Sequence, residues 1–183
     1  MKIMLRLFTC IWIPDDIRKM IVEFQEKLKK VPIKAKFVEP ENLHLTITFL
    51  GNVNETEVES LKNKLDDCVK DVKKFHVKLE GLKLIPGENY IRVIGLKIMD
   101  EGNVSRLIKR IGKSMDGKYH ETSKLTLCRV KNVLDKKKLR EFIEENRNVI
   151  VGSFHVKSVA LVKSTLTKHG PVYETTHESM LRA

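Results

Sequence analysis

The chain has no long hydrophobic run. Its most apolar stretch, residues 3–13, is interrupted by Arg6 and is shorter than the ~18 apolar residues of a membrane-spanning helix. It also lacks a small-residue cleavage site. We therefore expect neither a membrane span nor a signal peptide.

Glycine and proline are also scarce, with 9 and 5 residues in 183, and this excludes collagen-like and long disordered stretches. Aromatic residues make up only 6%, which argues against an extended platform for base stacking. Hydrophobic residues make up 42%, enough for a core. The length favours one compact unit over residues 1–183 and, by default, a monomer.

The cysteines are few and odd in number: Cys10, Cys68 and Cys128. Their spacing does not match any metal-ligand pattern, so we expect no metal and no cofactor. An odd set of thiols is typical of a reducing compartment, where they serve as small apolar side chains. The sequence therefore predicts a cytoplasmic protein.

Positive charge is in excess, with 35 Lys and Arg against 24 Asp and Glu, a formal charge of +11. Such a surface favours polyanions and makes their binding sensitive to salt. A surface rich in Lys and Glu, as in thermophiles, is the alternative. Charge alone does not decide between the two.

Hydrophobic periodicity predicts the same order of elements twice: strand, helix, strand, helix, strand. Strands are expected at residues 3–13, 43–50, 75–85, 90–98, 124–130 and 154–166, with helices between them and a loop between Pro32 and Pro40. Asn54 with Glu57 predicts a capping box at the start of one helix, and Asp135 predicts the N-cap of another.

Two segments recur at matching offsets. His44-Leu45-Thr46 corresponds to Lys124-Leu125-Thr126, 80 positions later, and FHVK at 75–78 recurs at 154–157, 79 positions later. We infer an internal duplication with approximate repeats 1–87 and 88–170 and a C-terminal tail. The predicted fold class is α+β and bilobal. Two lobes related by a pseudo-twofold axis would line a central cleft with antiparallel sheets and carry helices outside.

The two matched strands carry the candidate chemistry. His44 and Thr46 lie two apart in a strand and therefore share a face, as do Lys124 and Thr126. A histidine can transfer a proton near neutral pH, and a threonine hydroxyl can bind a phosphate oxygen. One such motif from each lobe could grip a phosphodiester between two proton-transfer groups, without a metal. A single histidine on a strand is more often structural.

Residues 40–51, PENLHLTITFLG, closely resemble the first HXTX motif of the RNA 2′,3′-cyclic phosphodiesterases, historically called 2′-5′ RNA ligases. This family belongs to the two-histidine phosphoesterase superfamily. Further segments are similar to its other motifs, in the expected order along nearly the whole chain: LRLF at 5–8, YIRVI at 90–94, STL at 164–166 and GPVYE at 170–174.

The resemblance implies opening of an RNA 2′,3′-cyclic phosphate end to a 2′-phosphate, with 2′-5′ RNA ligation as a reverse or side activity. By this resemblance His44 is the proton donor, and Lys124 occupies the position of the proton acceptor. Thr46, Thr126 and Tyr173 would bind substrate. Packing is an equal alternative for Tyr173. RNA ends or short oligonucleotides would be the partner.

The second motif departs from the family pattern F-x-P-H-x-T-L-x-R. Residues 121–129 read ETSKLTLCR, so Lys124 replaces the second histidine. A lysine has a pKa of ~10.4, and a fall of roughly 3 units, or ~4 kcal/mol, is needed before it accepts a proton at neutral pH. We therefore expect a charged Lys124 that binds phosphate.

Three hypotheses follow. The protein is an altered and impaired enzyme in which Lys124 stabilises negative charge, or it binds RNA ends without turnover, or His120 or His155 replaces the missing group. We also expect Arg129 on the strand face opposite Lys124, and Phe8 in the core.

Overall fold

The computed structural model describes residues 1–119 and 124–183. The elements of the described residues, in chain order, are β1 (Met4–Trp12), α1 (Asp15–Lys29), β2 (Ile33–Phe37), η1 (Pro40–Asn42), β3 (His44–Asn54), η2 (Glu55–Glu57), α2 (Val58–Val69), β4 (Phe75–Gly87), β5 (Tyr90–Met99), α3 (Asn103–Ser114), β6 (Lys124–Val133), α4 (Lys136–Glu145), β7 (Ile150–Val156), β8 (Ser158–Thr167) and β9 (Gly170–Met180).

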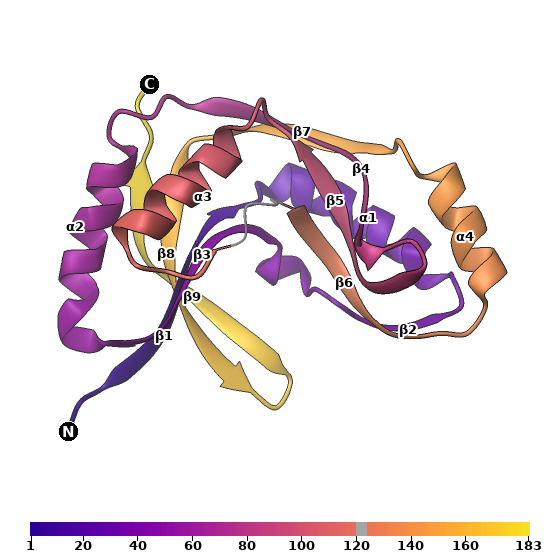
Figure 1. Cartoon of the computed structure of the whole chain (residues 1–183), viewed down its shortest axis with the longest axis horizontal. Helices are drawn as coiled ribbons and strands as arrows, with labels where there is room; N and C mark the ends of the chain where they lie inside the picture. Colours follow the sequence, from indigo (N-terminus) through magenta and orange to yellow (C-terminus); the bar gives the residue numbers. More distant parts are fainter. Residues whose placement is uncertain (120–123) are drawn as a thin grey trace.

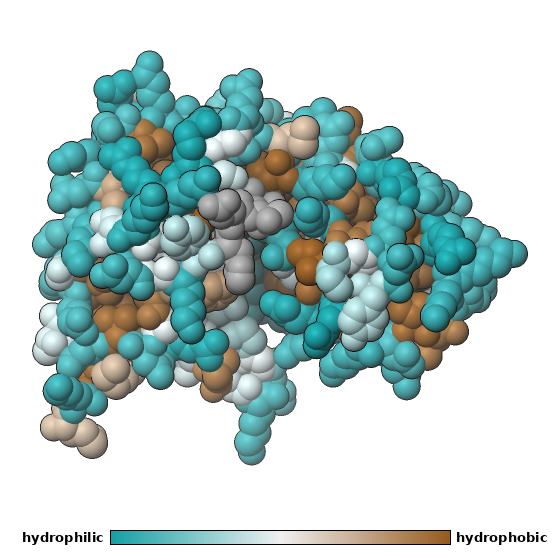
Figure 2. Space-filling model, viewed as in Figure 1, coloured by the Kyte–Doolittle hydropathy of each residue, from teal (hydrophilic) through white to brown (hydrophobic). Residues whose placement is uncertain are grey.

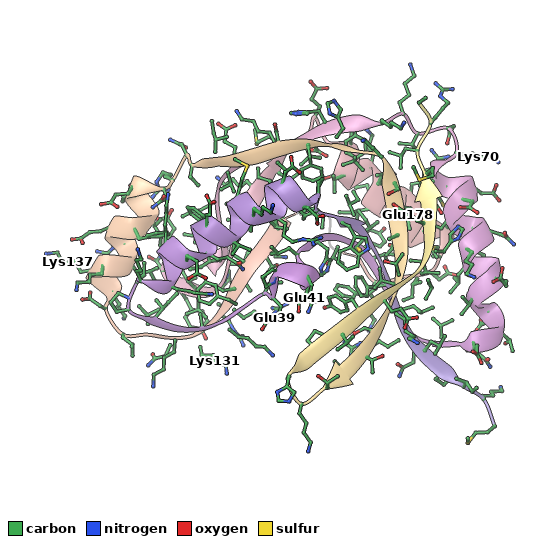
Figure 3. All side chains as sticks on the ribbon, turned by 180° about the vertical axis from the view of Figure 1, so that it is seen from behind. Glu39, Glu41, Lys70, Lys131, Lys137 and Glu178 are labelled. Atoms are coloured by element: carbon green, nitrogen blue, oxygen red, sulfur yellow. The ribbon has the colours of Figure 1, made fainter. Side chains whose placement is uncertain are left out.

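The strands form two antiparallel sheets that lie side by side (Figure 1). We call the sheet with strand order β3-β1-β8-β9 sheet A, and the sheet with order β2-β6-β5-β4-β7 sheet B. Helices α2 and α3 pack on sheet A and α1 packs on sheet B, while α4 contacts α1 through the rings of Phe24 and Phe142. Figure 3 shows α1 lying across the back of sheet B. The α+β, two-lobed fold class is therefore confirmed.

Two helical segments begin where the sequence predicts a cap. The side chain of Asn54 accepts a hydrogen bond from the backbone of Thr56 and forms a capping box with Glu57. Asp135 accepts from two backbone N–H groups at the start of α4. Each helix buries one apolar stripe; that of α1 consists of Ile17, Ile21, Phe24 and Leu28, while Met20 is exposed.

Each half of the chain contributes strands to both sheets. Strand β4, from the first half, lies in sheet B, and β8, from the second half, lies in sheet A. The helix after β1 covers sheet B, and the helix after β5 covers sheet A. Each lobe is thus built from both halves of the chain.

The matched segments occupy equivalent places. The first ten residues of β3 and the ten residues of β6 show the same order of buried and exposed positions. The two copies of FHVK pair with each other across β4 and β7, so that Phe75 faces Val156 and Val77 faces Phe154. His76 and His155 meet at the centre of this pairing, with ring centroids 5.1 Å apart. The pairing of the two copies is thus symmetric about His76 and His155.

Three parts of the strand prediction are wrong. The segment between Pro32 and Pro40 contains β2, which pairs with β6 at the edge of sheet B. The expected strand 154–166 is divided at Lys157, where the chain passes from sheet B to sheet A. The C-terminal segment 170–180 forms β9, which makes a projecting hairpin with β8 (Figure 1).

Candidate functional site

A cavity of about 890 Å³ lies between the uncovered faces of the two sheets. Figure 2 shows the molecule hollowed between the lobes on this side. The two walls differ in character. Most aromatic side chains of the cavity come from sheet A, and most of its cations come from sheet B: Phe8, Phe49 and Tyr173 on the first wall, and Lys36, Lys124 and Arg129 on the second. Arg6 of sheet A and Phe37 of sheet B are the exceptions.

His44 is held through both of its ring nitrogens. Nδ1 lies 2.5 Å from the carbonyl oxygen of Asn42, and Nε2 lies 2.9 Å from Oγ1 of Thr46. A carbonyl can only accept, so Nδ1 carries a proton. The second proton of the charged ring therefore resides on Nε2, beside Thr46.

Aromatic rings surround the imidazole of His44. The ring centroids of Phe8, Tyr173 and Trp12 lie 5.2, 5.5 and 5.8 Å from it. Burial among these rings lowers the pKa of His44 below the usual 6.5, although the hydrogen bond to Asn42 acts in the opposite direction. The proton on Nε2 is thus held less tightly than in water.

Tyr173 lies on β9 and both packs and lines the cavity. Its ring meets Phe8 edge-on at 4.9 Å between centroids, and burial raises the pKa of its hydroxyl. Phe8 also lines the cavity, although its side chain is only 4% exposed. Both alternatives considered for Tyr173 are therefore compatible with its position.

Lys124 lies at the start of β6, and the cavity lining includes its side chain, together with Thr126. Burial lowers the pKa of Lys124, and the positive charges of Arg129 and Lys83 lower it further. No carboxylate of the described residues stands among the charges that act on it. An anion in the cavity would therefore find an ammonium group whose charge no described acid neutralises.

Arg129 contradicts the prediction that it faces away from Lys124. A β-bulge at Leu127 leaves Cys128 opposite Ile94 and Thr126 opposite Gly95, so the alternation of faces changes after the bulge. Arg129 consequently lines the cavity with Lys124. The corresponding bulge at Ile47 in β3 places Phe49 in the cavity in the same way.

Sequence reasoning missed the role of Asn42 as a link between segments. Its side chain donates a hydrogen bond to the carbonyl of Pro171 at 3.1 Å, and its own carbonyl accepts from His44. Asn42 is only 8% exposed. It lies in the matched stretch 40–51, two residues before His44, which was the available signal. Arg6 and Lys36, also missed, add cations to the cavity lining.

The proposed substitute histidines do not enter the described cavity. His155 is exposed on β7 against His76, and the residues that line the cavity do not include it. His120 lies outside the described residues. Over residues 1–119 and 124–183, no group of three or more His, Cys, Asp or Glu side chains is arranged to hold a metal ion. None of the described helices has the length and apolar character needed to cross a membrane.

Comparison with solved structures identifies the class of fold. A protein of Thermus thermophilus, TT0787, superposes with a TM-score of 0.78 at 27% identity, covering 97% of this chain and 98% of that one. Escherichia coli LigT complexed with phosphate gives a TM-score of 0.76 at 21% identity over 98% and 99% of the two chains. Residues 11–95 match the family described as LigT like Phosphoesterase. The fold is that of a LigT-like phosphoesterase.

Curated relatives place the chain within this class. The RNA 2′,3′-cyclic phosphodiesterase of Methanocaldococcus jannaschii is 38% identical over 179 residues, which cover 95% of this chain and 99% of the relative. That of Methanothermobacter thermautotrophicus is 33% identical over 92% and 94% of the two chains. The chain therefore belongs to the RNA 2′,3′-cyclic phosphodiesterase family.

Proposed function

We propose that this protein hydrolyses the 2′,3′-cyclic phosphate end of an RNA to a 2′-phosphate without a metal ion. The observation that carries the proposal is the cavity between two matched strands, one presenting the doubly held His44 and the other a cationic group beside Arg129. The aromatic wall suits a nucleobase, and the cationic wall suits a phosphate. Relatives named for this reaction support the assignment.

His44 is the proton donor of the proposed reaction. Water attacks the phosphorus atom, the bond from phosphorus to the 3′ oxygen breaks, and Nε2 of the charged imidazole gives its proton to that oxygen. A 2′-phosphomonoester and a 3′-hydroxyl result. In the charged ring Nε2–H donates to Oγ1 of Thr46, and this contact orients the ring before the substrate arrives.

Lys124 stands in the place of the proton acceptor and stabilises the charge that develops on the phosphoryl oxygens. Its lowered pKa would bring it closer to a base, but a bound phosphate acts in the opposite direction and keeps it charged. The proton of the attacking water then leaves to solvent. We therefore expect slow turnover. Thr126, beside Lys124, would bind a phosphoryl oxygen.

The same arrangement can support 2′-5′ ligation. If a 5′-hydroxyl of a second RNA replaces water, its oxygen forms the new bond to phosphorus and the 3′ oxygen again leaves with the proton of His44. We expect this as a side activity of a monomeric, cytoplasmic enzyme. The three free, buried cysteines support a reducing compartment.

Replacing Lys124 tests the function directly. We expect Lys124→His to raise hydrolysis of a cyclic phosphate oligonucleotide above that of the natural chain, because a second imidazole can accept the proton of water. His44→Ala should lower kcat by about 10²–10⁴-fold, the usual contribution of a general acid. Lys137→His, on the outer face of α4, is the control and should leave the rate unchanged.

The product must be identified by the position of its phosphate. A 2′-phosphate supports the proposal. A 3′-phosphate alone, or unchanged activity in His44→Ala, would contradict it.

A second candidate is a protein that binds RNA ends without turnover. The observation in its favour is that Lys124 occupies the acceptor position, where a charged ammonium cannot take a proton. Salt-sensitive binding with no product at high enzyme concentration, and hydrolysis gained only in Lys124→His, would establish it.

A further inference from the structure

Two cross-strand pairs of like charge lie on the uncovered face of sheet B. Lys97 of β5 is directly opposite Lys124 of β6, and Lys36 of β2 is directly opposite Arg129. Side chains that face each other across antiparallel strands share one face of the sheet, and equal charges there destabilise it. The uncovered face of sheet B therefore contains two unfavourable pairs of positive charges.

The cations continue beyond the cavity. Lys83 of β4 lies opposite Gly95 of β5, which in turn lies opposite Thr126. The charge of Lys83 contributes to the lowered pKa of Lys124, so the two ammonium groups repel each other electrostatically. Lys83 and Lys97 are not among the cavity-lining residues. They extend the cationic wall across β5 and β4, at the ~4.8 Å spacing of neighbouring strands.

These lysines differ from those on the helices. Basic side chains on the outer helices form ion pairs with acids three positions away, such as Lys29 with Glu26 at 2.6 Å and Lys70 with Asp67 at 3.0 Å. Among the described residues, no ion pair includes Lys83 or Lys97. A thermophile-like surface of mixed Lys and Glu accounts for the helices, but it does not account for unneutralised lysines on a sheet.

The face is open to a large ligand. Helix α1 covers the other side of sheet B, and α4 lies at the far end of this lobe (Figures 1 and 3). The side seen in Figure 2 carries hydrophilic side chains around the hollow between the lobes. Lys97 is exposed and Lys83 is half-buried. A polyanion that entered the cavity by its end could therefore continue across this face.

We propose that Lys83 and Lys97 bind backbone phosphates of the nucleotides that precede the terminal phosphate of an RNA strand. The substrate is then a single strand of several nucleotides, and a mononucleotide cyclic phosphate uses only part of the site. This inference rests on the proposed function. Ammonium groups contact phosphates without reading bases, so the recognition is independent of sequence.

Equilibrium binding tests the proposal without requiring turnover. The probes are a dinucleotide and a longer single-stranded oligonucleotide that share the same 2′-phosphate end, measured by fluorescence anisotropy over a range of salt concentrations. The test variant is Lys83→Gln with Lys97→Gln. The matched control is Lys70→Gln with Lys137→Gln, which removes the same charge from the outer helices labelled in Figure 3.

We expect the longer strand to bind the natural protein more tightly than the dinucleotide, and the test variant to lose this advantage. Its slope of log affinity against log salt for the longer strand should become roughly 1.4 units shallower, from about 0.7 for each lost phosphate contact. The control should keep both length preference and slope. Equal losses in the two variants, or no dependence on strand length, would overturn the proposal.

The same variants separate this proposal from the proposed function. If the natural protein binds with the expected length dependence but opens no cyclic phosphate, the proposed function fails and the RNA path stands. If it opens a dinucleotide cyclic phosphate as fast as a longer one and binds both equally, the proposed function stands and the RNA path across Lys83 and Lys97 fails.

Discussion

At the scale of single residues, His44 depends on its neighbours for the position and the affinity of its proton. Asn42 holds Nδ1, Thr46 holds Nε2, and the surrounding rings remove water. Asn42 also ties the turn before His44 to β9 through Pro171. His44 is therefore fixed by sheet A and by the η1 turn that precedes it, before any ligand enters.

The pH dependence follows from this environment. A donor must be charged, and the pKa of His44 is lowered from 6.5, so kcat/KM should be greatest at acidic pH and fall as the pH rises through the lowered value. In Lys124→His the profile should become bell-shaped, since an acceptor imidazole must first lose its proton. Initial rates on a cyclic phosphate dinucleotide measure both profiles.

A rise of kcat/KM of the natural protein with increasing pH would contradict this assignment. It would mean that the neutral form of Lys124, whose pKa is also lowered, accepts the proton of water. A charged Lys124 that stabilises the phosphate predicts that kcat/KM falls with pH, and a neutral Lys124 that accepts a proton predicts that it rises.

At the scale of elements, the bulges decide which side chains enter the cavity. Strict alternation along β6 predicts Arg129 on the helix-covered side, but the extra residue Leu127 brings it to the face of Lys124. Residues 124–130 contain no glycine or proline that would indicate a bulge in the sequence. The signal lies on the partner strand, where Gly95 permits the close approach of β6.

Gly95→Ala should therefore disturb both stability and the site. A Cβ atom at Gly95 would lie 2.5 Å from the carbonyl oxygen of Leu125, so β5 or β6 must shift. We expect the free energy of unfolding to fall by about 1–3 kcal/mol, as for other overpacked positions. Catalytic efficiency should fall too, because Lys124 and Thr126 flank the displaced carbonyl.

Gly87→Ala is the matched control in urea denaturation. A Cβ atom there meets nothing within 4 Å, so its free energy of unfolding should stay within about 0.5 kcal/mol of the natural chain. Equal stability of the two variants would show that the close approach at Gly95 does not constrain the sheet.

At the scale of the whole molecule, the exchange of strands makes each lobe depend on the other. Sheet A needs β8 from the second half of the chain, and sheet B needs β4 from the first. The repeat boundaries at residues 87 and 88 remain a prediction, and they would divide the sequence but not the lobes.

We expect one cooperative unfolding transition. Trp12, the single tryptophan, lies on β1 of sheet A, so its fluorescence reports on that lobe. Far-ultraviolet circular dichroism reports on both lobes. The two urea curves should coincide, as in two-state unfolding. A fluorescence transition that precedes the dichroism transition would show that sheet A unfolds by itself.

The sequence predicted most of the elements and the two matched strands because these depend on local periodicity and on repeated residues such as FHVK. It did not predict β2. This segment forms a strand because it pairs with β6, a tertiary contact that local strand propensity does not reveal. It also could not show that β4 and β8 change lobes, since both halves of the chain read alike locally. Of the residues that line the cavity, His44, Thr46, Lys124 and Thr126 could be named from the motif, whereas Arg129 required the bulge.

The contact between His76 and His155 has an evolutionary consequence. A position on a dyad meets its own copy, as it would in a dimer of two identical chains. Such a dimer would have to carry either two imidazoles or two ammonium groups at its paired motif positions. If the two repeats arose by the inferred duplication, joining both copies in one polypeptide removed that restriction, so that one motif could mutate while the other kept its histidine.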